Sequence, residues 1–144
     1  MIQDALAIFA SAQSGTTSVA HTDIIDTLAA GSAYVGSWFV FQITTAYTQT
    51  GTTSRVTVQL QTSDVSAFTD SDDVTLVASQ AFTTANLAAG KFWATRIPAG
   101  VKRYVRAYNL VSGTDGGNAF TAGAWNSFLT PDIDLEINKR YMIQ

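Results

Sequence analysis

The chain has 144 residues and a net charge of −3, and only 13% of its residues are charged, where an average soluble domain has about 25%. It contains no cysteine and one histidine, which excludes disulfides, thiolate nucleophiles, zinc–sulfur sites and multi-histidine metal centres. The negative net charge argues against a general affinity for nucleic acid. The composition therefore predicts one domain that acts by contact and needs no cofactor.

The first dozen residues are apolar enough to resemble a secretory signal at first sight. However, Asp4 stands where a signal peptide carries positive charge, and the first basic residue is Arg55. The apolar run is also too short to cross a bilayer. We therefore expect an intracellular protein with no membrane partner, in which residues 1–14 form an arm or extension that docks elsewhere.

From Gly36 onward the dominant pattern has period two, which is typical of strands. Over residues 55–61, apolar and polar side chains alternate, which predicts a strand with one buried face. Residues 38–43 are apolar on both faces and predict either a central strand covered on both sides or an interface strand. The polar residues 48–53 are expected to join these two strands as a hairpin loop.

The remaining strands are expected in five segments: near 22–28, and at 74–79, 91–97, 102–111 and 121–129. Residues 81–89 fit either a turn or two of helix or a connection. Seven or eight strands without helical crossovers favour an all-β fold. We expect a single antiparallel β-sandwich or jelly-roll-like domain over residues 1–144.

An acidic cluster over residues 64–73 raises the question of a calcium site. An EF-hand loop that starts at Asp70 would need glycine where Thr75 stands and glutamate where Ala81 stands. The segment is therefore expected to be a solvated loop, although a looser cation site stays open. No metal site is predicted.

The parts of a hydrolytic site are present without any motif. His21 lies close in sequence to Asp23 and Asp26, but no Gly-x-Ser-x-Gly elbow, Walker loop or dinucleotide fingerprint is present. We expect His21 to be a turn or capping residue and predict no catalytic residue and no enzyme activity. A metal-assisted hydrolase would require His21 to converge with the aspartates in space.

The three tryptophans, Trp38, Trp93 and Trp125, fall in predicted strands. Such residues build either an aromatic platform for sugars or the core of a sandwich. Core packing is favoured, because aromatic side chains dominate the buried area of small β domains. The alternative function that these tryptophans suggest is a carbohydrate-binding jelly-roll module of the receptor-binding or adhesion type.

Charge is unevenly distributed along the chain. The first 90 residues hold one basic and seven acidic residues, whereas residues 91–144 hold seven basic and four acidic ones. On a strand, Lys102, Tyr104, Arg106 and Tyr108 would share one face. This pattern predicts either a basic, tyrosine-lined surface for a partner or internal ion pairs with the 64–73 loop.

Four segments carry a resemblance to a known family. They are TDIIDTL at 22–28, VQLQTSD at 58–64 with Phe68 following, RYVRAY at 103–108 and FTAGAWN at 120–126. In order and spacing they resemble the small capsid cement, or decoration, proteins of tailed phages, the group similar to the cement protein of a Bordetella podophage. The chain departs from the pattern at Thr27-Leu28-Ala29, where Leu-Gly is expected.

This resemblance implies a non-enzymatic structural protein of the virion. It would be made in the bacterial host cytoplasm, bind the outside of an assembled capsid, bridge subunits of the major capsid protein and self-associate as a symmetric dimer or trimer. The expected contact residues combine the basic segment with the N-terminal arm: Arg96, Lys102, Arg103, Tyr104 and Arg106, and Ile2, Leu6 and Phe9.

Overall fold

The computed structural model describes residues 7–21, 23–28, 36–69, 73–113, 119–133 and 142–143. These residues form nine strands and no helix. The strands are β1 (Ile8–Ser14), β2 (Val19–Ala20), β3 (Ile25–Asp26), β4 (Trp38–Thr50), β5 (Arg55–Ser63), β6 (Val74–Ala78), β7 (Phe92–Arg96), β8 (Tyr104–Ser112) and β9 (Ala119–Thr130). Within the described part of the chain, no helix is long and apolar enough to cross a membrane.

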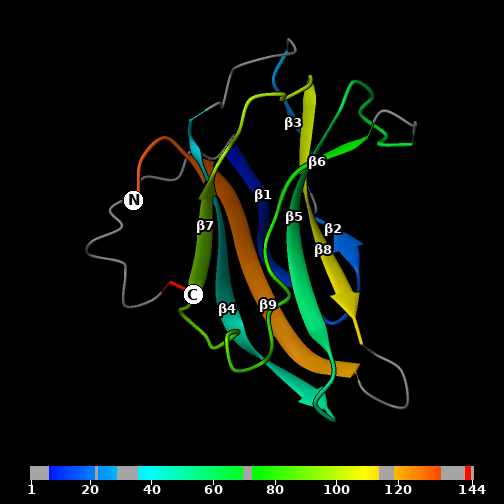
Figure 1. Ribbon diagram of the computed structural model, residues 1–144, viewed down its shortest axis with the longest axis vertical. Coiled ribbons are helices and arrows are strands. Elements are labelled where there is room, and N and C mark those ends of the chain that lie inside the picture. Colours follow the sequence, from blue (N-terminus) through cyan, green and yellow to red (C-terminus); the bar gives the residue numbers. More distant parts are fainter. Residues whose placement is uncertain are drawn as a thin grey trace.

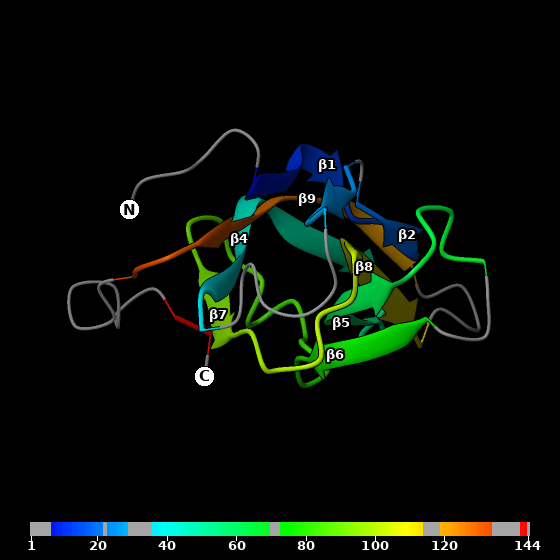
Figure 2. The same ribbon diagram turned by 90° about the horizontal axis from the view of Figure 1, so that it is seen from above.

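The strands form two sheets that lie face to face (Figures 1 and 2). The first sheet has the order β1-β9-β4-β7, and the second has the order β2-β8-β5-β6, with β3 also paired to β8. All of these strand pairs are antiparallel. The expected all-β antiparallel sandwich is confirmed.

One connection differs from the sequence-based expectation. Strand β4 pairs with β7 and β9, whereas β5 pairs with β6 and β8, so the turn after Thr50 passes from one sheet to the other and is not a hairpin loop. The burial of the two strands accounts for this difference. Strand β4 needs cover on both faces, whereas one face of β5 stays partly exposed to solvent. Of the two alternatives for residues 81–89, the connection is correct, because these residues form a bridge from Phe82 to Val56 and turns.

Strand β1 replaces most of the expected N-terminal extension. From Ile8 onward the chain pairs with β9 at the edge of the first sheet. Phe9 is fully buried and packs edge to face against Phe39, with ring centroids 5.8 Å apart. The expectation that Phe9 contacts a partner is therefore corrected, because its ring belongs to the core of its own chain. Ile2 and Leu6 lie outside the described residues.

Strand β4 is covered on both faces. Its inward side chains contribute to the main core between the sheets, whereas Val40 packs on the outer face with Phe92 and Ile133. Residues 142–143 follow the edge of β7, where the Ile143 amide donates to the Phe92 carbonyl at 2.8 Å. Met142 packs against the outer apolar cluster. Of the two alternatives for residues 38–43, the central strand covered on both sides is therefore correct.

Two glycines make room for a buried tyrosine. The ring of Tyr47 lies over Gly123, where an added Cβ would come within 2.6 Å of a ring carbon. An added Cβ at Gly15 would come within 1.9 Å of the Tyr47 hydroxyl oxygen. The Gly15 amide donates to the Gly123 carbonyl at 2.9 Å, which joins the two glycine backbones beside this ring.

We expect Gly123→Ala to lower the free energy of unfolding by roughly 2–4 kcal/mol, because it combines overpacking with backbone strain. Gly123 has φ +147°, a conformation that favours glycine. The matched control is Gly90→Ala, which also has positive φ but has no atom within 4 Å of the added Cβ. Urea denaturation should show a clearly larger loss for Gly123→Ala, and equal losses would contradict this account.

His21 links the two sheets inside the core. It follows β2, its Nδ1 hydrogen-bonds the Ser127 hydroxyl on β9, and the Trp125 indole donates to the same nitrogen at 3.4 Å. Its Nε2 is buried without a hydrogen-bond partner in the described part of the chain. Burial lowers the pKa of His21 to about 3. The expectation of a turn or capping histidine is therefore wrong, because the ring lies between the sheets.

This burial predicts loss of stability in acid. The pKa of His21 falls from 6.5 in the unfolded chain to about 3 in the fold, so its contribution is complete above pH 6.5 and is lost as pH falls toward 3. Protonation of the unfolded chain should cost about 2 kcal/mol of unfolding free energy between pH 8 and pH 5. Urea denaturation at both values should show that His21→Gln has the smaller change, and the same change in both proteins would refute the assignment.

Candidate interaction surface

The outer side of the second sheet carries a row of polar and aromatic side chains. Along β8, Tyr104, Arg106 and Tyr108 are half-exposed and alternate with buried residues, as the sequence pattern predicts. Strand β5 places Gln61 opposite Arg106 and Gln59 opposite Tyr108. We call these five side chains the β8 face.

Arg106 is held in a fixed position on the β8 face. Its Nε donates to Gln61 Oε1 at 2.8 Å. Its guanidinium carbon lies 4.2 Å from the ring centroid of Phe68 and 5.8 Å from that of Tyr108. Within the described residues no carboxylate forms an ion pair with it. Stacking therefore orders a positive charge that remains unneutralised by these residues.

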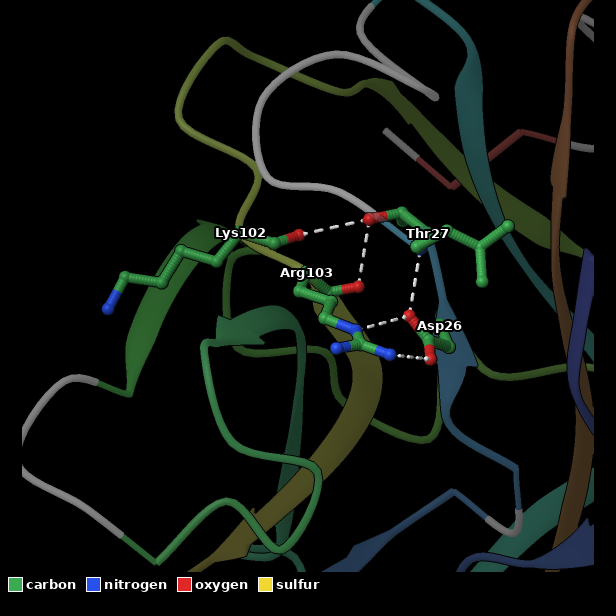
Figure 3. A network of polar contacts seen from close by, with 5 residues as sticks. Asp26, Thr27, Lys102 and Arg103 are labelled. Carbon is green, nitrogen blue, oxygen red and sulfur yellow. Dashed lines mark hydrogen bonds and ion pairs between the residues drawn. The ribbon is translucent and has the colours of Figure 1, made fainter.

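At one end of β8, Arg103 pairs with Asp26 on β3 (Figure 3). Arg103 Nε and Nη2 each donate to one oxygen of the Asp26 carboxylate at 3.0 Å. The hydrogen bond from Arg103 lowers the pKa of Asp26, and the same bond raises the pKa of Arg103. The Thr27 amide and hydroxyl both donate to the Arg103 carbonyl at 2.8 Å. This exposed pair, with Thr27, fastens β3 to the start of β8.

Leu28 lies beside this ion pair and is 81% exposed. Its amide donates to Asp26 Oδ1 at 2.8 Å, and its φ is +66°, in the left-handed region. A leucine seldom adopts this conformation, and the hydrogen bond to Asp26 supports it here. The sequence signal at this position was the departure of Thr27-Leu28-Ala29 from the family pattern, which did not identify Leu28 as exposed.

The other expected basic contacts have partners of different kinds. Lys102 Nζ lies 3.2 Å from the Asp64 carboxylate, so one internal ion pair with the 64–73 loop is present. Arg96 lies in β7 of the other sheet, where it stacks 4.8 Å over Trp38 and donates to the Gly36 carbonyl at 2.8 Å. The expected contact residues therefore do not form one patch.

The structure brings four of them together along β8 and its start: Lys102, Arg103, Tyr104 and Arg106. Of the predicted acidic loop, Asp70 and Asp72 lie outside the described residues.

The three tryptophans do not form a common platform. Trp125 is fully buried, and Trp93 packs edge to face against Phe39 and Phe82, with centroids 6.0 and 6.3 Å away. Trp38 packs on the outer cluster of the first sheet. The tryptophans, which motivated the carbohydrate-binding alternative, thus give it no common aromatic platform.

In the described residues, His21 and Asp64 do not converge on a site that a metal-assisted hydrolase would need. His21 is enclosed by the core, whereas Asp64 is exposed and paired with Lys102. No group of three or more His, Cys, Asp or Glu side chains in these segments could hold a metal ion.

Comparison with known proteins identifies the family of the chain. None of the curated proteins matches the chain. The family model Bbp16 matches residues 9–129, a span that begins in β1 and ends in β9 and therefore takes in both sheets. The chain belongs to the Bbp16 family, whose name indicates a Bordetella phage protein.

Proposed function

We propose that the chain is a structural virion protein that binds the outer surface of a tailed-phage capsid and reinforces it by bridging subunits of the major capsid protein. The observation that carries this proposal is the match of the phage-related Bbp16 family over residues 9–129. The four segments that resemble cement proteins include parts of β3, β5, β8 and β9, so the resemblance extends over both sheets.

The two outer faces of the sandwich differ in character. The outer side of the first sheet carries a buried apolar cluster, to which Ile133 and Met142 contribute. The outer side of the second sheet carries the half-exposed β8 face, whose tyrosines and arginine are favoured residue types at interfaces. We therefore assign capsid docking to the β8 face rather than to Phe9 or Arg96.

Binding by this mechanism stabilises the assembled capsid through mass action. A protein that binds only the assembled lattice shifts the equilibrium toward it, and many copies around symmetry axes add avidity. We also propose that the chain self-associates as a symmetric dimer or trimer, which would let each assembly bridge several capsid subunits.

The direct test is co-sedimentation with expanded, undecorated phage heads. We expect the purified protein to pellet with the heads in a saturable manner and to raise the temperature at which the heads release DNA or disassemble. Circular dichroism on the unbound fraction should verify that the protein is folded. Absence of pelleting by folded protein over a wide concentration range would refute the capsid-binding function.

A second test examines whether the Asp26–Arg103 pair fastens β3 to the start of β8. Arg103→Glu places a second negative charge beside Asp26, and we expect it to lower Tm slightly and to loosen β3 from β8. The swapped variant Asp26→Arg with Arg103→Asp restores an ion pair and should recover Tm. If thermal melts show no recovery, the Asp26–Arg103 pair does not fasten these strands.

A further inference from the structure

We propose that the β8 face is a carboxylate-binding surface, on which Arg106 pairs with an Asp or Glu side chain of the capsid subunit between Tyr104 and Tyr108. This inference rests on the proposed function, because it names the chemistry of the partner at the same surface.

The hydrogen bond of Arg106 to Gln61 leaves the two Nη atoms of the guanidinium for a carboxylate. Nε is committed to Gln61, while the two Nη atoms have no hydrogen bond within the described segments. The guanidinium carbon lies over the ring of Phe68, 4.2 Å from its centroid. A carboxylate approaches in the plane of the guanidinium, along its edge, so the stacking and the new pairing are compatible.

Comparison with neighbouring cations singles out Arg106. Lys102 is paired with Asp64, and Arg103 is paired with Asp26 through both carboxylate oxygens. An additional carboxylate at either position would have to compete with an existing partner. Arg106 has only neutral contacts, an amide and aromatic rings, in the described residues. An incoming carboxylate therefore neutralises its charge without breaking an ion pair between described residues.

The surroundings of Arg106 favour a strong pair. Gln61 and Phe68 already fix the side chain, so little rotamer freedom is lost on binding. Tyr104 and Tyr108 stand two residues away on either side, on the same half-exposed row. When a partner covers these rings it displaces water from around the ion pair, which strengthens the pair.

One guanidinium between tyrosines fits one carboxylate better than a polyanion. A nucleic acid would require several adjacent uncompensated cations, whereas Lys102 and Arg103 beside the β8 face are already paired. The chain itself has net charge −3, so a second copy is another source of carboxylates. Either partner would have to present a carboxylate to Arg106. We assign this carboxylate to a capsid subunit, because the proposed function places the capsid on this face.

The test measures binding of Arg106 variants to undecorated heads by sedimentation. We expect Arg106→Gln to weaken binding by a factor on the order of 10–100, and Arg106→Lys to recover only part of it, because lysine cannot pair through two nitrogens. The matched control is Arg96→Gln, which removes a stacked arginine from the other sheet and should bind as the wild type does. Heads whose surface carboxylates have been amidated with carbodiimide and ethanolamine should bind the wild type as weakly as untreated heads bind Arg106→Gln.

The outcomes separate this inference from the function on which it rests. If the wild-type protein does not bind heads, both the capsid-binding function and the carboxylate site are refuted. If the wild type binds and Arg106→Gln binds equally well, capsid docking stands and the carboxylate site is refuted. Equal weakening by Arg96→Gln, or loss of binding only in proportion to a lower Tm, also refutes it. If sedimentation equilibrium shows that Arg106→Gln abolishes self-association, the carboxylate belongs to a second copy and the assignment to the capsid is wrong.

Discussion

A strand that is apolar on both faces has to be covered twice, and β4 imposes this requirement on the whole molecule. Its inward side chains form the core with the second sheet. Its outward Val40 is buried by Phe128 and Phe92 beside it and by Ile133 and Met142 near the C-terminus. The hydrophobic effect favours this cover, since each buried aliphatic side chain contributes about 1.5–3 kcal/mol. Covering β4 on both sides leaves the outer face of the second sheet as the half-exposed one.

The distribution of ion pairs then determines which part of that outer face is suited to the docking that we propose. Exposed ion pairs contribute little to stability, but they do determine which charges are already compensated. Asp26 and Asp64 compensate Arg103 and Lys102 at the start of β8. Arg106 is ordered instead by neutral groups. In the sequence these three cations are equivalent. In the structure they differ, because two of them pair with a carboxylate and Arg106 contacts an amide and aromatic rings.

Much of the fold was predictable because β-strand periodicity is local. The strands that contain residues 55–61 and 104–108 alternate as expected, and the two-faced pattern of residues 38–43 marked the central strand. Strand β1 was missed because Ala12 has φ +50° and the register shifts twice along β1, which interrupts the period of two. The environment of His21 was not predictable, since its partner Ser127 lies 106 residues away.

The candidate site was predictable only in part, for a related reason. Arg96 and Arg103 are seven positions apart in the sequence, yet the intervening turn carries the chain from one sheet to the other. Sequence proximity therefore grouped cations that lie at different sheets. On β8 the alternation of side chains did place Tyr104, Arg106 and Tyr108 together, because that relation depends on strand geometry alone. The availability of Arg106 depends on Phe68, Gln61 and the absence of a nearby described carboxylate, and only the packing of separate segments determines it.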